Sequence, residues 1–364
     1  MNAATDRDMM TRALALAERG LFTTTPNPRV GCVIARGAEV LGEGWHERAG
    51  EAHAEVRALD DARARGNDVR GATAYVTLEP CNHHGRTPPC TDALLASGIE
   101  RVVSAMHDPH TEAAGGAERL KAAGLAVEVG LLEEAARELN VGWLHRLRCG
   151  RPWVRVKVAA SLDGRTALEN GASQWITGEE ARADGHRWRA RACAILTGIG
   201  TVRHDDPRLT VRAIATPRQP IKVIVDRHGD VPATARVLEG GDVILVTAIQ
   251  PVASLPGNVQ VITVPDRDGR IDLRAMVNAL GEREINELHV EAGARLNGAM
   301  LAAGIVDELL LYFAPCLLGE PSRGMFALPA PLDRLDQRAS LSVRSIDALG
   351  GDWRIVARVD PKSA

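Results

Sequence analysis

Apolar and polar positions along the first part of the chain alternate between a helical and a strand-like spacing. Residues 9–19 carry apolar side chains at helical intervals before Gly20, and residues 53–65 do the same before Gly66. Short apolar runs predict strands at 30–35, near residue 40, at 72–78 and at 101–106, with a further helix at 90–98. Strands that alternate with helices of this length are typical of an α/β sandwich.

The pattern changes near residues 146–153, where Gly150 and Pro152 interrupt it and a new β-rich run begins. We therefore predict two domains, residues 1–148 and 149–364, which suits a usual domain size of roughly 100–200 residues. The second domain is predicted to hold strands near 154–158, 194–197, 221–225, 243–247, 260–264, 286–291 and 308–314, and helices near 178–191, 272–280 and 294–303. Its end reads as two strands joined by Gly350 and Gly351, so we expect a mixed sheet.

Composition and charge narrow the functional classes. The chain is 45% apolar and 25% charged with a formal net charge of −3, as in ordinary globular proteins. It has no block of like charges, no secretory signal pattern and no stretch near the ~20 apolar residues of a membrane span. We expect a cytoplasmic protein without nucleic-acid or membrane partners, whose six cysteines are ligands or buried thiols. Cys32, Cys193 and Cys316 are predicted to lie in the core and Cys149 in a linker.

Three potential metal ligands stand where predicted elements begin or end. His53 opens the helix 53–65, Cys81 follows the strand 72–78, and Cys90 lies in the first turn of the next helix, which favours a thiolate. One imidazole and two thiolates predict a zinc site whose fourth position is open to water, as in catalytic sites. Glu55 is placed to face that water and to shuttle protons. A His-x-Glu followed later by Pro-Cys is the pattern of zinc deaminases.

Two alternatives to this interpretation remain. His83 and His84, between the cysteines, are either loop or substrate contacts or competing ligands for the metal. If one of them closed the site, the protein would hold a structural zinc ion and Glu55 would have no role. The other alternative is a zinc deaminase of another free or nucleic-acid base with a non-catalytic second domain, which the lack of a basic surface pattern disfavours.

Seven segments of the chain match the motifs of one enzyme family. In the first half they are TTPNPRVGCVI (24–34), GEGWHERAGEAHAEV (42–56) and VTLEPCNHHGRTPPCTDALLASGI (76–99). In the second half they are KVAASLDGRTA (157–167), SQWITG (173–178), TVRHDDPRLTVR (201–212) and VEAGARLNGAMLAAGIVDELLLYFAPCLLG (290–319). On these residues the chain resembles the bifunctional deaminase-reductases of riboflavin biosynthesis. The long loop between Cys81 and Cys90 distinguishes this family from cytidine and tRNA-adenosine deaminases.

The resemblance implies a fold and two successive reactions. It implies an α/β protein, with an N-terminal cytidine-deaminase-like three-layer sandwich followed by a dihydrofolate-reductase-like mixed-sheet domain. Zn²⁺-dependent hydrolysis would convert 2,5-diamino-6-(5-phosphoribosylamino)pyrimidin-4(3H)-one to 5-amino-6-(5-phosphoribosylamino)uracil, releasing ammonia. NADPH would then reduce the ribosyl group to give 5-amino-6-(5-phosphoribitylamino)uracil. A homo-oligomer, dimer or tetramer, is expected.

The resemblance also implies roles for individual residues. In the deaminase, His53, Cys81 and Cys90 would bind zinc, Glu55 would be the proton shuttle, and Asn27 and His46 would lie in the pyrimidine pocket. In the reductase, substrate contacts are implied at Ser173, Arg189, Leu209, Arg212 and Glu291. The guanidinium groups of Arg189 and Arg212 also match phosphate oxygens geometrically.

No Gly-x-Gly-x-x-Gly motif follows a predicted strand, so the sequence does not predict a Rossmann cofactor site. The resemblance implies NADPH contacts at Ala159, Trp175, Thr201, Asp205, Arg227, Gly293, Ala294, Arg295, Leu296, Asn297, Gly298 and Ala299. The last seven begin a predicted helix, whose first N–H groups suit phosphate. Asp205 is the expected catalytic residue, which orients cofactor and substrate or assists ring opening. Asp206-Pro207 is alternatively a turn that positions Thr210 and Arg212.

Two positions depart from the family pattern. Gly115 and Gly116 are adjacent, where the family usually has a basic residue between two glycines, which predicts the loss of a substrate or loop contact. Ala292 stands where many members have glycine, so the backbone there is expected to be less permissive. Neither position is a predicted zinc ligand.

Overall fold

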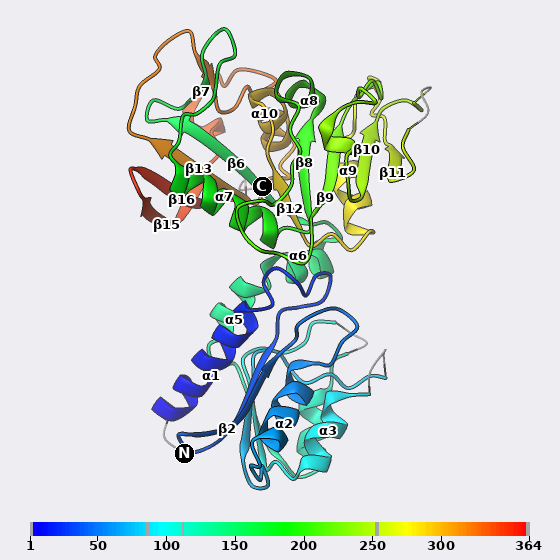
Figure 1. Cartoon of the computed structure of the whole chain (residues 1–364), viewed down its shortest axis with the longest axis vertical. Helices are drawn as coiled ribbons and strands as arrows, with labels where there is room; N and C mark the ends of the chain where they lie inside the picture. Colours follow the sequence, from blue (N-terminus) through cyan, green and yellow to red (C-terminus); the bar gives the residue numbers. More distant parts are fainter. Residues whose placement is uncertain (1–2, 85–87, 111–112, 252–254, 362–364) are drawn as a thin grey trace. The chain divides into compact units, whose positions relative to one another are not determined.

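The computed structural model describes residues 3–84, 88–110, 113–251 and 255–361. The chain forms two compact units, Met1–Cys149 and Gly150–Ala364 (Figure 1). Within the described ranges, none of the helices combines the length and the apolar character needed to cross a membrane.

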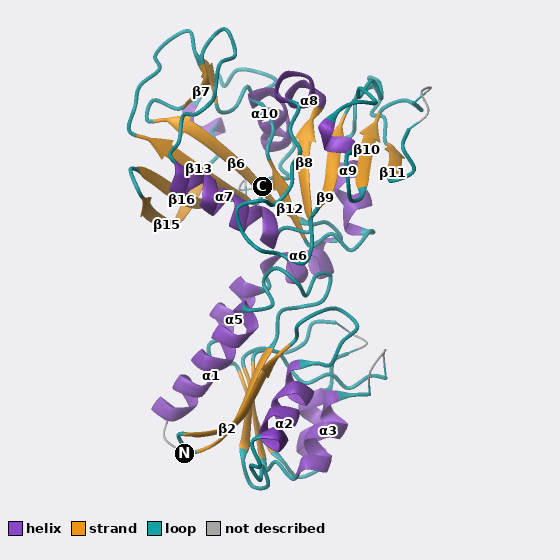
Figure 2. Cartoon of the chain, in the orientation of Figure 1, coloured by secondary structure: helices purple, strands orange, loops and turns teal. Residues whose placement is uncertain are grey.

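The first unit is a five-stranded sheet between two layers of helices, with α1 and α5 on one face and α2 and α3 on the other (Figure 2). The strand order is β2-β1-β3-β4-β5, in which β1 runs antiparallel to both neighbours and β3, β4 and β5 are parallel. The strands are β1 (Gly31–Arg36), β2 (Glu39–Trp45), β3 (Thr73–Val76), β4 (Arg101–Ser104) and β5 (Ala126–Val129). The helices are α1 (Ala3–Glu18), α2 (Ala54–Ala64), α3 (Cys90–Ser97), α4 (Gly116–Ala122), α5 (Glu133–Leu139) and α6 (Val141–Cys149). The predicted three-layer sandwich is confirmed.

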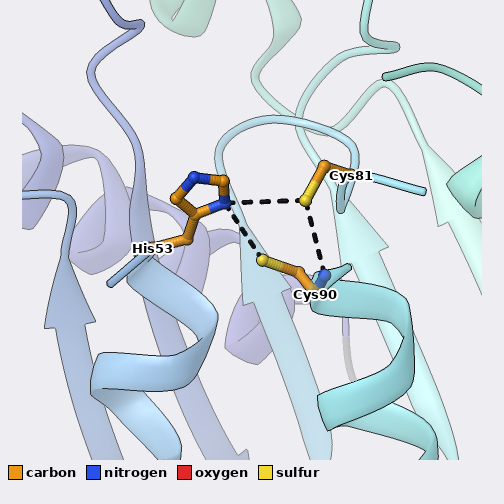
Figure 3. Close-up of side chains that lie close together, drawn as sticks. All are labelled: His53, Cys81 and Cys90. Atoms are coloured by element: carbon orange, nitrogen blue, oxygen red, sulfur yellow. Dashed lines mark hydrogen bonds between the residues drawn. The ribbon is translucent and has the colours of Figure 1, made fainter. Parts of the chain in front are cut away.

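Two glycines in β2 allow helix α2 to lie directly against the sheet. A Cβ on Gly42 would lie 2.3 Å from the Ala58 carbonyl oxygen, and one on Gly44 would lie 2.7 Å from the Ala58 amide nitrogen. Any side chain at these positions would push the helix outward, because real Cβ atoms do not approach other atoms so closely. The contact fixes the start of α2, where His53 lies (Figure 3).

The second unit is built on a nine-stranded mixed sheet. Its order is β11-β10-β9-β8-β12-β6-β13-β16-β15, parallel from β11 to β13 and antiparallel at β16 and β15. Its strands are β6 (Trp153–Ser161), β8 (Ala194–Gly198), β9 (Ile221–Val225), β10 (Val243–Thr247), β11 (Val259–Thr263), β12 (Glu287–Val290), β13 (Glu308–Ala314), β15 (Leu341–Leu349) and β16 (Asp352–Val359). The helices are α7 (Glu179–Arg191), α8 (Ile199–Asp205), α9 (Leu273–Gly281) and α10 (Ala294–Ala302). A separate ribbon pairs β7 (Arg165–Ala167) with β14 (Arg323–Gly324), and the mixed sheet confirms the prediction.

The structure differs from the predicted elements where segments are short. Helices α4 and α8 have seven residues each, too few for a clear helical period, and β5 alternates exposed and half-buried residues without a fully buried position. The prediction that Cys316 lies in the core was wrong, because β13 ends at Ala314 and the following residues are exposed. Cys32 and Cys193 are buried as expected.

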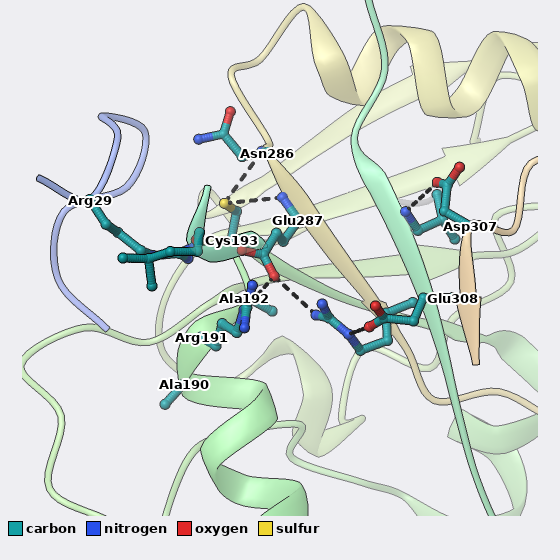
Figure 4. Close-up of polar contacts among 12 residues, drawn as sticks. Arg29, Ala190, Arg191, Ala192, Cys193, Asn286, Glu287, Asp307 and Glu308 are labelled. Atoms are coloured by element: carbon teal, nitrogen blue, oxygen red, sulfur yellow. Dashed lines mark hydrogen bonds and ion pairs between the residues drawn. The ribbon is translucent and has the colours of Figure 1, made fainter. Parts of the chain in front are cut away.

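A buried charge network joins the central strands β12, β6 and β13 (Figure 4). Arg155 of β6 is only 1% exposed; its Nη1 donates to Glu287 Oε2 at 3.0 Å and its Nε donates to Glu308. Arg191 donates to the same Glu287 oxygen at 2.8 Å, and the Arg155 guanidinium lies 4.3 Å from the centre of the Trp188 ring. Because each charge is neutralised only in this alignment, the network favours one register of three neighbouring strands.

Replacing Arg155 tests this network. Arg155→Met removes the cation that pairs with both Glu287 and Glu308 while their carboxylates stay buried, so the free energy of unfolding in urea should fall by about 3–5 kcal/mol. Arg283→Met is the matched control, since this guanidinium donates to the Ala279 carbonyl oxygen in an exposed position, and it should change stability by less than about 0.5 kcal/mol. A loss in Arg155→Met no larger than in the control would contradict the proposed strand-aligning role.

Candidate active sites

Three donor side chains converge at the start of α2, in the loop after β3 and at the start of α3 (Figure 3). His53 is the N-cap of α2 in an extended conformation, with φ −73° and ψ 166°. Its Nδ1 lies 3.2 Å from Cys90 Sγ and 3.5 Å from Cys81 Sγ, and the three donor atoms lie within 4.8 Å of one another. One imidazole nitrogen and two sulfurs at this spacing fit a Zn²⁺ ion.

Neither histidine of the loop after Cys81 joins this donor cluster. His83 is half-buried and His84 is exposed, and within the described ranges the cluster comprises His53, Cys81 and Cys90. Three protein ligands are the number found in catalytic zinc sites, whereas structural sites are closed by a fourth. The donor count therefore favours a catalytic site.

Hydrogen bonds hold the Cys81 and Cys90 segments together and shift the pKa values of the two thiols in opposite directions. The Cys90 backbone N–H points to Cys81 Sγ at 3.4 Å, and Thr91 N donates to the Cys81 carbonyl oxygen at 3.3 Å. The pKa of Cys81 is lowered because the Cys90 side chain and His53 both hydrogen-bond its sulfur, whereas Cys81 and burial raise the pKa of Cys90. Cys81 is therefore the thiol that ionises first.

Glu55 lies in the first turn of α2 and is 3% exposed. Burial, followed by repulsion from the Cys81 thiolate, raises its pKa to about 7, although His53 opposes the shift. A carboxyl group with this pKa both gains and loses a proton at neutral pH, as a proton shuttle must.

Asn27 and His46 lie together beside the donor cluster. The His46 ring is 5.2 Å from the His53 ring, edge to face, and its Nε2 lies 3.0 Å from Asn27 Nδ2. Its Nδ1 lies 3.2 Å from the Ala52 carbonyl oxygen, which only accepts, so Nδ1 carries the proton and Nε2 accepts from the Asn27 amide. Burial lowers the pKa of His46 and keeps the ring neutral. The orientation of the Asn27 amide is thereby fixed.

The adjacent glycines of the first unit have a packing reason. Gly115 has a φ of 89°, which favours glycine, and a Cβ on Gly116 would lie 1.8 Å from the Pro80 carbonyl oxygen. Both residues allow α4 to begin directly against the loop that carries Cys81.

In the second unit, most of the expected cofactor residues lie near or just after the carboxyl ends of parallel strands. Ala159 lies in the second half of β6, Thr201 and Asp205 lie in α8 after β8, Arg227 follows β9, and residues 293–299 follow β12. Because these four strands are parallel, the residues share one edge of the sheet, where ligands of α/β proteins bind (Figure 1).

The helices after β8 and β12 begin side by side at this edge. A Cβ on Gly198, the N-cap of α8, would lie 3.2 Å from the Leu296 side chain in the first turn of α10. A Cβ on Gly293, the N-cap of α10, would meet no atom within 4 Å among the residues the structure describes. The N-cap of α10 is therefore uncrowded on the side where a Cβ would lie, and the first N–H groups of a helix are suited to bind a phosphate.

The remaining cofactor residues vary in exposure. Trp175 is 71% exposed, and the Arg182 guanidinium lies 4.8 Å from the centre of its ring. Asp205 is exposed at the end of α8. Asp206 is the left-handed C-cap of α8, with a φ of 40°, and its Oδ1 accepts a hydrogen bond from Arg236 N at 2.8 Å. The residues after it, Pro207 included, are assigned to neither a helix nor a turn, so the alternative of an Asp206-Pro207 turn stays a prediction.

Several expected substrate residues of the second unit lie together. Arg189 of α7 forms a two-point ion pair with Glu291, with Nε–Oε1 at 2.5 Å and Nη2–Oε2 at 2.8 Å, and its Nη1 donates to the Thr210 carbonyl oxygen. Arg212 Nη1 lies 3.4 Å from Thr210 Oγ1. Leu209 precedes this segment with its side chain buried, which leaves only its backbone for a ligand. Ser173 lies half-buried in the loop before α7 and is not part of this ion-pair cluster.

Sequence reasoning missed two members of this cluster. His186 Nδ1 accepts a hydrogen bond from Arg212 N at 3.3 Å, and burial together with Arg189 and Arg212 lowers its pKa to about 4. Lys157 of β6 has a pKa lowered by burial and interacts electrostatically with Glu291 and Arg189. The i, i+3 spacing of His186 and Arg189 on one face of α7 is the signal that could have identified the histidine.

Comparisons with known proteins match both units of the chain to known families. Residues 3–106 match the cytidine and deoxycytidylate deaminase zinc-binding region, and residues 152–354 match the RibD C-terminal domain. The riboflavin biosynthesis protein RibD of Escherichia coli K12 is 46% identical over 361 residues, covering 95% of this chain and 97% of that protein. That of Haemophilus influenzae is 41% identical over 361 residues, covering 95% of both.

Two solved structures match nearly the whole length of this chain. Acinetobacter baumannii RibD, form 1, has a TM-score of 0.90 at 40% identity, covering 99% of this chain and 100% of that one. A Thermotoga maritima protein described as a diaminohydroxyphosphoribosylaminopyrimidine deaminase/5-amino-6-(5-phosphoribosylamino)uracil reductase has a TM-score of 0.90 at 33% identity, covering 98% and 99%. Since relatives of such identity match nearly end to end, this chain belongs to the RibD family of riboflavin biosynthesis proteins.

Proposed function

We propose that this chain is a bifunctional enzyme of riboflavin biosynthesis. Residues 1–148 deaminate 2,5-diamino-6-(5-phosphoribosylamino)pyrimidin-4(3H)-one to 5-amino-6-(5-phosphoribosylamino)uracil, and residues 149–364 reduce that product with NADPH to 5-amino-6-(5-phosphoribitylamino)uracil. The observation that carries the proposal is the three-donor cluster beside buried Glu55, in a chain that the Thermotoga deaminase/reductase matches nearly end to end.

In the deaminase, His53, Cys81 and Cys90 hold the metal. Zn²⁺ held by these residues would supply a Lewis acid that activates a water molecule. Glu55 accepts a proton from the water that attacks the pyrimidine carbon bearing the 2-amino group, and it delivers a proton to the departing nitrogen, which leaves as ammonia. Asn27, oriented by His46, binds the pyrimidine. The hydrogen bond between these two residues and their position beside His53 support this role.

In the reductase, bound NADPH would supply the hydride for C1 of the ring-opened ribose. The first N–H groups of α10, in residues 293–299, hold a cofactor phosphate, and Ala159, Trp175, Thr201 and Arg227 complete the cofactor site. Asp205 orients cofactor and substrate. The position of most of these residues after parallel strands that end at one sheet edge supports the assignment.

Substrate binding in the reductase uses the cationic cluster. Three of the five N–H donors of Arg189 are committed to Glu291 and Thr210, so this arginine mainly fixes the Glu291 carboxylate. Arg212, which makes one side-chain contact to Thr210, is the better partner for the substrate phosphate. Ser173 and the Leu209 backbone complete the site.

We further propose that the enzyme works in the cytoplasm as a homodimer or homotetramer. None of the cysteines, all of which lie in the described ranges, forms a disulfide, as expected in a reducing compartment. Strand β15 is an edge of the nine-stranded sheet, and its Val343 and Ile346 side chains are exposed, which is a feature of strands that subunits cover.

A coupled assay tests the two reactions. Purified zinc-loaded protein is incubated with the diaminopyrimidinone ribose phosphate, and ammonia release and NADPH oxidation are followed separately. We expect both signals, with ammonia release persisting when NADPH is omitted because deamination comes first. Ammonia without NADPH oxidation would reduce the second unit to a non-catalytic module, and the absence of both would indicate a structural zinc protein.

Replacing Glu55 separates metal binding from proton transfer. Glu55→Gln should retain one zinc ion per chain, because the three donors are unchanged, yet lose at least 100-fold in ammonia release, on the order of the 10²–10⁴-fold that proton transfer contributes. NADPH oxidation on the preformed aminouracil substrate is the internal control and should stay at the wild-type rate. Unchanged ammonia release would exclude Glu55 as the shuttle.

Replacing Arg212 tests the phosphate contact. Arg212→Gln should raise the reductase KM for the phosphorylated substrate about 10–100-fold, because a hydrogen bond to a charged group contributes about 1.5–3 kcal/mol. Arg283→Gln, an exposed arginine beyond α9, is the matched control and should leave KM unchanged. Equal KM values for the two variants would place the phosphate elsewhere.

A further inference from the structure

We propose that Arg119 of α4 is a positioning residue that sets the separation of the two zinc-binding thiols. The inference rests on the proposed zinc site of His53, Cys81 and Cys90. Arg119 touches neither sulfur in the hydrogen bonds and ion pairs found among the described residues; it acts through the residues that follow each cysteine.

The Arg119 guanidinium bridges the two segments that carry the cysteines. Its Nη1 donates to Asn82 Oδ1 at 2.8 Å and to Thr91 Oγ1 at 3.1 Å, and its Nη2 forms an ion pair with Asp92. Asn82 directly follows Cys81, and Thr91 and Asp92 directly follow Cys90. A third link closes the triangle, since Thr91 Oγ1 donates to Asn82 Oδ1 at 3.3 Å.

Helix α4, which carries Arg119, begins in direct contact with the loop that carries Cys81. Ala117 N at the start of α4 donates to Glu79 Oε1 at 2.9 Å, and Asn82 N donates to the Ala113 carbonyl oxygen at 3.0 Å. Gly116 packs so closely on the Pro80 carbonyl oxygen that no Cβ fits between them. Helix α4 is therefore held against the loop at several points, and the arginine extends from it to α3.

Chemistry explains why an arginine suits this position. A guanidinium is a planar fork whose N–H groups reach several acceptors at once, whereas a lysine ammonium is a single point charge. Holding the Cys81 and Cys90 segments in place before metal binding removes an ordering cost from the binding step. The Arg119 and Asp92 side chains are each 40% exposed, so their ion pair adds little to folding stability, and its removal acts mainly on the metal site.

The test compares zinc affinity in full-length variants by chelator competition. Arg119→Gln should raise the zinc Kd about 10–100-fold, the usual effect of losing a residue that orients metal ligands, and Arg119→Lys should fall between it and wild type. Arg137→Gln is the matched control, because Arg137 also pairs with an exposed carboxylate from a helix of the same unit, Glu133 at 2.7 Å. It should keep the wild-type Kd.

A spectroscopic measurement reports the thiol geometry directly. Replacing zinc by Co²⁺ gives a thiolate-to-metal charge-transfer band, whose position and intensity should change in Arg119→Gln and remain unchanged in Arg137→Gln. NADPH oxidation on the preformed aminouracil substrate should be identical in all variants, because the second unit is untouched. Unfolding midpoints of the metal-free proteins should also agree.

Each outcome has a distinct meaning. An unchanged zinc Kd and Co²⁺ spectrum in Arg119→Gln would overturn the inference and leave the proposed function intact. An equal drop in the unfolding midpoint with and without zinc would assign Arg119 a merely structural role and also overturn it. A wild-type protein that binds no zinc would instead overturn the proposed deaminase site itself.

Discussion

Both candidate sites depend on one constraint, that parallel strands end at the same edge of their sheet. In the first unit β3 and β4 are parallel neighbours, so the loops after them meet, and Glu79 N donates to the Met106 carbonyl oxygen at 2.9 Å. The helices after these loops carry Cys90 and Arg119 to the same place. In the second unit the same rule gathers residues after β6, β8, β9 and β12, which are far apart in the sequence.

Two buried carboxylates, Glu55 and Glu291, have pKa values shifted in opposite directions because their charged neighbours differ. Burial and the nearby Cys81 raise the pKa of Glu55 to about 7, and the opposing effect of His53 is smaller. Burial would also raise the pKa of Glu291, but the Arg189 fork holds it well below its usual value. Glu55 is therefore suited to exchange protons, whereas Glu291 is suited to stay charged and to bind a ligand. The different roles of the two carboxylates follow from their different surroundings.

Site residues at the ends of strongly patterned strands and helices could be predicted from the sequence. Site residues whose position depends on tertiary packing could not. His53, Cys81 and Cys90 were predictable because each stands at the boundary of a strongly patterned strand or helix. Helix α4 was not, since its seven residues show no clear period, and Arg119 was hidden with it. His186 lacks a sequence signal apart from its spacing to Arg189, and the burial of the Leu209 side chain depends on packing against residues distant in the sequence, such as Ile224.

The close contact between β2 and α2 has a consequence for how the enzyme can evolve. Gly42 and Gly44 touch neither metal nor substrate in the proposed mechanism, yet any side chain at either position displaces the helix whose first turn bears His53 and Glu55. In a library with every substitution at each position, these two glycines should therefore tolerate as few replacements as the catalytic residues do, as judged by deaminase activity. Neutral drift along β2 is restricted to the other positions of the strand, and a lineage that lost either glycine would need a compensating change in α2 to recover deamination.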